Sequence, residues 1–417
     1  MAKSLRLFTL PLVMLAAAAA FAQPRFALRD GDRVVFYGDS ITDQRLYTTF
    51  TETFVVTRFP KLDVSFIHSG WGGDRVSGGG GGPIDVRLWR DVLAYNPTVM
   101  TIMLGMNDGH YKPFDQAAFD EFTAGYKHIV EVAKKQLPGI RITAIQPSPY
   151  DDVTRPPLFE GGYNAVLLRF ADFLQQLAAD QKLTLADLNT PVVAMLTKAK
   201  DLDAAAAARI LPDRIHPGAG GHLIMAEALL KAWNAPGTVS AVEIDAARKE
   251  TVRQVNARVT GLQVAKDVSW TEMDEALPMP FDTHDAGIAL AVRASDFTDA
   301  LDREPLTVRG LAAGSYTLSI DGEAMGNFTS AQLAQGIDLA ALPTPMMRQA
   351  AAVHALTVQH VAMHQTRWRN VQVPLEKTSA EHLPQALQAL DAVEADLIRA
   401  QRAAAQPRAH QFELTAQ

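Results

Sequence analysis

A serine follows directly on an apolar run near the start of the chain. Residues 34–37 have the composition of a buried strand, and Gly38-Asp39-Ser40 turns the chain at its end. A hydroxyl at the carboxyl end of a buried strand, where α/β sheets bind ligands, is a candidate nucleophile. A helix cap would explain Ser40 alone equally well. The nucleophile interpretation therefore requires a base elsewhere in the chain.

A base and its partner occur together in Asp213-Arg214-Ile215-His216. In one loop, Asp213 can hold one imidazole nitrogen of His216 while the other nitrogen faces Ser40, which is the arrangement that serine hydrolysis uses. The same chemistry needs donors for an oxyanion. A free glycine amide and an asparagine NH₂ are suitable, and Gly70-Trp71-Gly72-Gly73 and Gly105-Met106-Asn107-Asp108 supply them, with the Ser40 amide as a third donor.

The elements that position these residues alternate between short β-rich runs and longer amphipathic runs. Strands are predicted at 33–37, 62–68, 98–104, 140–145 and 183–187, and helices at 44–59, 84–95, 114–136, 162–180 and 220–233. This alternation predicts a three-layer α/β/α sandwich around a five-stranded parallel sheet. The serine and both donor segments then lie at the carboxyl ends of strands.

With these blocks in order, the chain resembles the SGNH or GDSL family of esterases and lipases. The family's Ser, Gly, Asn and His correspond to Ser40, Gly73, Asn107 and His216, and its orienting aspartate to Asp213. The resemblance covers residues 33–234 and implies the flavodoxin-like fold of that family. Many members have an asparagine where this chain has His68, and the glycine donor is assigned to Gly73 rather than Gly72 by alignment.

The resemblance implies ester hydrolysis through an acyl-Ser40 intermediate. His216 would take the serine proton, and the amides of Ser40 and Gly73 with the side chain of Asn107 would bind the oxyanion. No metal or organic cofactor is required. The chain contains no Gly-x-Ser-x-Gly elbow, which argues against an α/β-hydrolase.

The composition limits which partners the protein is expected to bind and in which compartment it is expected to act. Lys3 and Arg6 precede an apolar stretch that ends in Ala20-Phe21-Ala22, which predicts a signal peptide over residues 1–22 and a secreted or periplasmic protein without a stable membrane anchor. A net charge of −7 with no long basic run argues against nucleic acid. The chain has no cysteine, which excludes thiol catalysis and cysteine-ligated metal sites. The sequence does not indicate an oligomeric state.

The turn at 234–237 ends the predicted hydrolase domain, residues 23–235, and residues 236–417 are predicted to form a smaller α+β region ending in helices. In it, Val252, Val255 and Val259 suggest a helix, whereas the alternations at 288–292 and 316–320 suggest strands. The tail from 346 to about 405 reads as helical.

Four further features have modest interpretations. The glycines at 78–82 are not followed by Gly-Lys-Ser/Thr and predict a flexible loop beside the site rather than a phosphate loop. His360 and His364 have the spacing of two metal ligands, but no third ligand can be assigned, so structural or surface roles are favoured. Arg367-Trp368-Arg369 is expected to pack the two regions together rather than to stack on a sugar. For Trp71, a place in the wall of the active site and a place in the hydrophobic core are about equally well supported.

The leading hypothesis is a secreted serine esterase that removes small acyl groups, acetyl above all, from carbohydrate, with small-molecule or polysaccharide esters as substrates. The alternatives are a lipase, thioesterase or arylesterase for longer acyl chains, and a glycan-binding module without activity. The substrate class rests on analogy with exported family members, which is weak support because one fold hosts many functions.

Overall fold

The computed structural model describes residues 25–378 and 380–417. The predicted signal peptide, residues 1–22, lies outside the described residues. Within the described ranges, no helix combines the length and the apolar character needed to cross a membrane.

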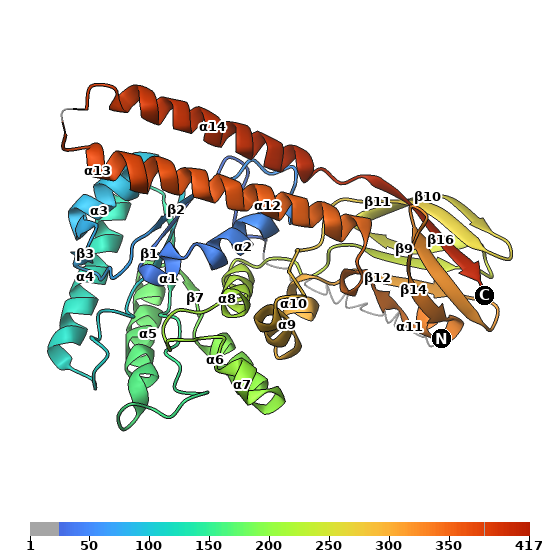
Figure 1. Ribbon diagram of the computed structural model, residues 1–417, viewed down its shortest axis with the longest axis horizontal. Coiled ribbons are helices and arrows are strands. Elements are labelled where there is room, and N and C mark those ends of the chain that lie inside the picture. Colours follow the sequence, from blue (N-terminus) through green and yellow to red (C-terminus); the bar gives the residue numbers. More distant parts are fainter. Residues whose placement is uncertain (1–24, 379) are drawn as a thin grey trace, which may run out of the picture.

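A five-stranded parallel sheet forms the centre of the first half of the chain, as predicted (Figure 1). Two of its interior strands, β1 (Arg33–Gly38) and β5 (Val99–Met103), are buried almost throughout, which explains why they appear in the sequence as apolar runs. In spatial order the strands are β2 (Ser65–Gly70), β1 (Arg33–Gly38), β5 (Val99–Met103), β6 (Arg141–Ile145) and β7 (Thr184–Ala186).

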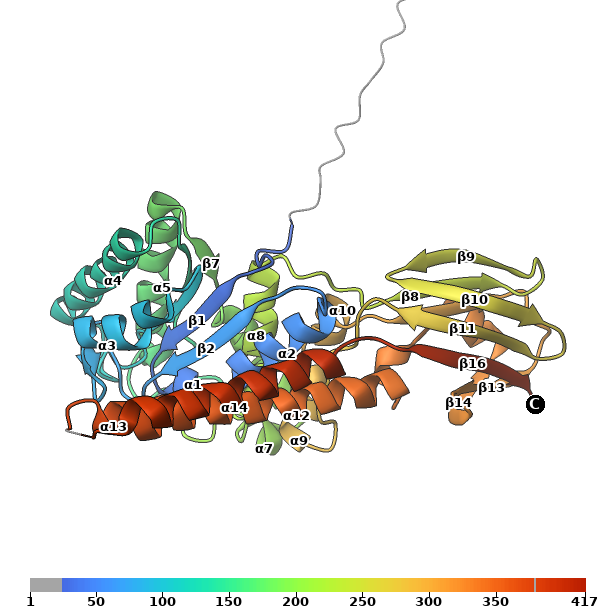
Figure 2. The same ribbon diagram turned by 90° about the horizontal axis from the view of Figure 1, so that it is seen from above.

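Helices cover both faces of this sheet, which completes the predicted three-layer sandwich (Figure 2). One face carries α3 (Ile84–Asp91), α4 (Gln116–Gln136) and α5 (Gly162–Gln181), and the other carries α2 (Leu46–Arg58) and α8 (Ala219–Ala232). The remaining short elements of this half are α1 (Ser40–Asp43), β3 (Gly78–Gly79), β4 (Gly82–Pro83), a 3₁₀ turn (Leu93–Tyr95), α6 (Thr190–Leu202) and α7 (Ala204–Ala207).

Two further sheets, at the right of Figure 1, pack into a β-sandwich. Trp270 and Phe412 stack in its core, which also holds Ile244 and Val308 from the second sheet. The first sheet has the order β10 (Ala257–Val264), β11 (Val268–Asp274), β16 (Ala409–Ala416), β13 (Ser315–Ile320) and β14 (Glu323–Thr329); the second has the order β15 (Ile337–Asp338), β12 (Pro305–Arg309), β8 (Ala241–Asp245) and β9 (Glu250–Val255). The last strand of the chain, β16, lies in the middle of its sheet and was not predicted.

Two elements of this region differ from the prediction. Val252 and Val255 belong to β9 and Val259 to β10, and Asn256 between the strands has a left-handed φ of 50°, so the expected helix is a hairpin. The expected strand at 288–292 is instead helix α9 (Ala286–Arg293). Asp285 caps that helix by accepting hydrogen bonds from the amides of Gly287 and Ile288, and alanine favours helix.

The predicted helical tail forms a hairpin that packs on the hydrolase half. Helix α12 lies against α2, and α14 lies against α12 (Figure 2). Helix α9 packs on α8, and Ile288 and Leu290 join the first hydrophobic core, so residues beyond 236 contribute to both halves. The helices of this region are α9, α10 (Phe297–Leu301), α11 (Ser330–Gln335), a 3₁₀ turn (Leu339–Ala341), α12 (Pro345–Gln365), a π-helical segment (Thr366–Gln372), α13 (Val373–Leu375) and α14 (Leu383–Ala404).

A buried polar network joins this hairpin to the central sheet. Glu52 of α2 is bonded to His360 of α12 through Oε1 and Nδ1 at 2.9 Å, and to His68 of β2 through Oε2 and Nε2 at 3.0 Å. His360 also contacts Glu394 of α14 at 3.1 Å. His360 and His364, both buried, are therefore structural residues between helices, the favoured reading of the sequence.

The charges in this network follow from its geometry. Burial lowers the pKa of His360, but Glu52 and Glu394 overcome that effect and raise it to about 10. Burial would raise the pKa of Glu52, yet the charge and hydrogen bond of His360 and the hydrogen bond of His68 bring it well below its usual range. Burial lowers the pKa of His68 to about 4 in spite of Glu52. The network thus holds one imidazolium, His360, between two carboxylates.

We expect His360→Gln to reduce the free energy of unfolding by about 3 kcal/mol near pH 6, because Glu52 and Glu394 lose their buried cation. His360 binds its proton more tightly in the folded state than in the unfolded state. Its stabilisation is therefore complete below pH 6.5 and is lost as the pH rises toward 10, so the difference between wild type and variant should shrink over that window. Urea titrations at a series of pH values measure this difference.

His128→Gln, at an exposed histidine of α4, is the matched control and should leave the pH profile unchanged. A difference between wild type and His360→Gln that stays constant from pH 6 to pH 10 would contradict a charged His360.

Candidate active site

Ser40 is the first residue of α1, directly beyond the end of β1. Asp39 caps this short helix, its Oδ1 accepting a hydrogen bond from the amide of Ile41 at 3.0 Å. Burial raises the pKa of Asp39 to about 8. The carbonyl of Gly38 accepts the amide of Trp71 at 3.0 Å, which joins this turn to the loop after β2. The backbone therefore fixes Ser40 at the carboxyl edge of the sheet.

His216 and Asp213 lie in the loop before α8, and the structure brings both to Ser40. The Ser40 hydroxyl lies 2.8 Å from His216 Nε2, and His216 Nδ1 lies 2.7 Å from Asp213 Oδ2. Because a carboxylate only accepts hydrogen bonds, Nδ1 carries the proton and Nε2 is free to accept from the serine. Three groups from segments far apart in sequence thus form one hydrogen-bonded chain.

Asp213 holds the backbone of its own loop as well as the imidazole. Its Oδ1 accepts the amides of His216 at 2.8 Å and Ile215 at 2.9 Å. Partial burial would raise the pKa of Asp213, but the hydrogen bonds from the His216 amide and ring and the Ile215 amide lower it below its usual value. Asp213 therefore stays ionised in the neutral range and orients His216.

The two sequence-predicted oxyanion donors lie in adjoining loops. Asn107 Nδ2 donates to the carbonyl of Asp74 at 2.9 Å, which ties the loop after β5 to the loop after β2. Gly73 has a left-handed φ of +78°, which glycine adopts at little cost. The Gly72 amide donates to Asp43 Oδ2 at 3.2 Å, whereas in the described part of the chain the Gly73 amide has no protein acceptor. This difference favours Gly73 over Gly72 as the free donor.

Tyr111 and Gln44 also contact this site, and the sequence reading missed both. The Tyr111 hydroxyl donates to Asn107 Oδ1 at 2.7 Å. Gln44 donates to the carbonyl of Pro217 at 3.2 Å and contacts His222 Nε2 at 3.1 Å, so it supports the loop that carries His216. Their spacing, four residues after Asn107 and after Ser40, is the one signal in the sequence, and it is too common to identify them.

The C-terminal hairpin reaches the loop that carries Gly73. Trp368, fully buried in the π-helical segment, meets Trp71 edge to face at 5.7 Å and donates to Asp91 Oδ1 at 2.6 Å. The guanidinium of Arg369 lies over the Trp71 ring. Trp71 is 8% exposed, so it packs between the two regions rather than forming an open wall. The expectation that Arg367-Trp368-Arg369 packs the regions together agrees with these contacts.

Arg87 of α3 lies beneath the same loop. It donates to Asp74 Oδ2 at 2.6 Å and to the carbonyl of Ser69 at 2.8 Å, and it pairs with Asp91. All of its surface is buried. The glycine segment at 78–82, expected as a flexible loop, forms the β3–β4 hairpin above Arg87, where a Cβ at Gly81 would come 2.6 Å from Trp71.

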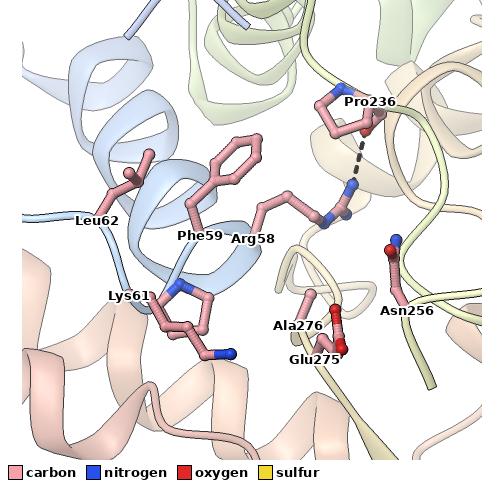
Figure 3. Close-up of a pocket in the computed structure, with 9 residues that line it drawn as sticks. Arg58, Phe59, Lys61, Leu62, Pro236, Asn256, Glu275 and Ala276 are labelled. Carbon is pink, nitrogen blue, oxygen red and sulfur yellow. Dashed lines mark hydrogen bonds between the residues drawn. The ribbon is translucent and has the colours of Figure 1, made fainter. Parts of the chain in front are cut away.

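A hollow of about 390 Å³ lies at a different place, between the end of α2 and the start of the second region (Figure 3). Arg58 reaches across it to the carbonyl of Pro236 at 2.7 Å, and Lys61 and Glu275 lie at its rim. No nucleophile with a neighbouring base lines it, so it is not a candidate catalytic site. Among the described residues, no group of three or more His, Asp or Glu side chains is placed to hold a metal ion.

Comparisons with known proteins agree with this geometry. The sequence profile of the GDSL-like lipase/acylhydrolase family matches residues 36–224. An acetylxylan esterase of Geobacillus stearothermophilus is 25% identical over 227 residues, which are 48% of this chain and 93% of that protein. The solved structure of a gut microbial diltiazem-metabolizing enzyme superimposes with a TM-score of 0.82 at 26% identity, over 95% of this chain and 99% of that one.

The likeness to the diltiazem-metabolizing enzyme extends over the β-sandwich and the helical hairpin, because it spans nearly the whole chain. The acetylxylan esterase likeness covers 48% of this chain, and residues 36–224, which match the family profile, include Ser40, Asn107 and His216. Both halves therefore have known counterparts, and the candidate active site lies in the first. Residues 36–224 therefore match a GDSL-like lipase/acylhydrolase domain, and the chain is a carboxylic ester hydrolase.

Proposed function

We propose that the protein is a serine esterase that removes small acyl groups, acetyl above all, from carbohydrate through an acyl-Ser40 intermediate. The observation that carries the mechanism is the chain from Ser40 Oγ to His216 Nε2 at 2.8 Å and from His216 Nδ1 to Asp213 Oδ2 at 2.7 Å. A nucleophile, its base and an orienting carboxylate within hydrogen-bond reach are what acyl transfer requires.

The proposed reaction has two steps that use the same groups. Ser40 Oγ attacks the ester carbonyl as its proton passes to His216 Nε2, and His216 then returns that proton to the leaving alcohol. A water molecule, deprotonated by His216, attacks the acyl-Ser40 ester, releases the carboxylic acid and restores the serine. In both steps the amides of Ser40 and Gly73 and Asn107 Nδ2 stabilise the oxyanion.

The choice of acetylated carbohydrate rests on the acetylxylan esterase likeness, which spans 93% of that enzyme. The second candidate substrate class is esters of small non-carbohydrate molecules. It is favoured by the likeness over 95% of this chain to an enzyme named for diltiazem rather than for a glycan. A comparison of kcat/KM for acetylated xylo-oligosaccharides and for aryl acetates discriminates between the two classes.

For the acyl group, the proposed preference for acetyl predicts that kcat/KM on p-nitrophenyl esters falls at least about tenfold from acetyl to hexanoyl, because a site fitted to acetyl would exclude added methylenes. Initial rates across the acyl series measure this preference. A maximum at six carbons or more would instead support the lipase, thioesterase or arylesterase alternative. Failure of a fluorophosphonate to label Ser40 would support a glycan-binding module without activity.

Export is also part of the proposal. Residues 1–22 have the charged start, apolar stretch and small-residue cleavage site of a signal peptide, so the mature chain would begin at Gln23 in the periplasm or outside the cell. Amino-terminal sequencing of protein recovered from a bacterial host tests this boundary.

A further inference from the structure

Two consecutive residues after Asn107 have left-handed backbone. His110 has φ of 54° and Tyr111 has φ of 58°. Non-glycine residues seldom adopt this conformation, and strained backbone tends to occur where function requires a particular geometry. The amide of His110 closes the turn on the carbonyl of Asn107 at 3.2 Å. This strained turn directs the chain back so that Tyr111 meets the side chain of Asn107.

The contact defines how the Asn107 amide is oriented. The Tyr111 hydroxyl donates to Oδ1 at 2.7 Å, while Nδ2 donates to the carbonyl of Asp74 at 2.9 Å. An amide turned the other way would set its oxygen against the Asp74 carbonyl and leave the Tyr111 proton without its acceptor. One N–H of Nδ2 is used by Asp74, and the other remains for a ligand.

The Tyr111 hydroxyl can donate its hydrogen bond to Asn107 over the whole neutral pH range. Tyr111 is 37% exposed, and its partial burial, together with the charges of Asp39 and Asp213, raises the pKa of its phenol to about 12, so it keeps the proton that it donates. Its ring lies 5.1 Å from the ring of Tyr163, whose hydroxyl donates to the carbonyl of Met106 at 2.7 Å. The ring is thereby braced against the loop that carries Asn107.

We propose that Tyr111 is a positioning residue of the oxyanion hole, which holds the Asn107 amide in its donating orientation and polarises it through the hydrogen bond to Oδ1. This inference rests on the proposed esterase function. Hydrogen bonds in a chain strengthen one another, so donation to Oδ1 makes the remaining N–H a better donor. The benefit grows as negative charge develops on the oxyanion and therefore belongs to kcat rather than to KM.

The test is a double-mutant cycle between Tyr111→Phe and Asn107→Ala, with hydrolysis of p-nitrophenyl acetate as the assay. Asn107→Ala should lower kcat by about a hundredfold, the usual loss for one oxyanion donor. Tyr111→Phe alone should lower kcat about tenfold and change KM less than about twofold. In the Asn107→Ala background, Tyr111→Phe should change kcat less than about twofold, because its partner is gone.

Tyr150→Phe is the matched control. Tyr150 lies near Tyr111, with ring centroids 6.4 Å apart, but among the described residues its hydroxyl makes no hydrogen bond to another side chain. It should leave kcat unchanged in both backgrounds. Equal losses from Tyr111→Phe in the presence and absence of Asn107, or a loss confined to KM, would overturn the inference. If the wild-type protein shows no Ser40-dependent hydrolysis, both the proposed function and this inference are overturned. If the wild type hydrolyses the ester normally and Tyr111→Phe has the same kcat, only the inference is overturned.

Discussion

Replacement of Ser40 with alanine is expected to lower kcat for p-nitrophenyl acetate by about 10⁴-fold or more, because it removes the atom that forms the acyl intermediate. His216→Ala should cost about as much, since Ser40 without its base is a weak nucleophile. The two losses should not add in the double variant, because both side chains act in one proton transfer across the 2.8 Å contact.

The measurement is steady-state kinetics together with covalent labelling by a fluorophosphonate. Wild type should label at Ser40, His216→Ala should label much more slowly, and Ser40→Ala should not label. Ser319→Ala, a half-buried serine of β13 far from the site, is the matched control and should retain full activity. A Ser40→Ala protein with wild-type activity would eliminate the mechanism.

The second large effect is expected at Arg87. Arg87→Met should reduce the free energy of unfolding by about 3–5 kcal/mol, because it removes the buried cation that pairs with Asp74 and leaves Asp91 with Arg90 as its one arginine partner among the described residues. It should also lower kcat, since Asp74 supplies the carbonyl that Asn107 bonds at 2.9 Å. Urea unfolding at constant pH and the p-nitrophenyl acetate assay measure the two effects.

Arg87→Lys keeps the charge but loses the forked geometry, so an intermediate loss is expected, and this variant remains informative if Arg87→Met does not fold. Arg248→Met is the matched control: Arg248 is 70% exposed beside Glu250, and such surface pairs contribute little. Equal destabilisation at positions 87 and 248 would show that the buried ion pairs of Arg87 contribute no more to the free energy of unfolding than a surface pair.

The sequence predicted the first half of the fold well, for a reason that particular strands illustrate. Strands β1 and β5 are buried on both faces, so their residues form apolar runs that stand out between amphipathic helices. In the second half, strands have one solvated face and turns are close together, so a valine spacing that resembled a helix belonged to the β9–β10 hairpin. Alternation at 288–292 was equally misleading, because a cap at Asp285 and alanine-rich sequence produced helix α9.

The residues of the candidate site also fall into two groups, those that the sequence indicated and those that it did not. Ser40, Asn107 and the pair Asp213 and His216 could be named as candidates from the sequence because each lies in a short segment whose chemistry is local. Tyr111, Gln44 and Arg87 were not found, because tyrosine, glutamine and arginine at those positions have many ordinary explanations. Their roles depend on which neighbours the folded chain provides.

By itself, the sequence indicated the central sheet, because buried strands appear as apolar runs of consecutive residues. The reaction class followed from the order of the four chemical segments and their resemblance to the SGNH or GDSL family. Only the tertiary structure decided that Trp368 and Arg369 support the loop of Gly73, and that His360 joins the hairpin to Glu52. These contacts join residues about 300 positions apart, and the packing of whole elements, rather than any local pattern, brings them together.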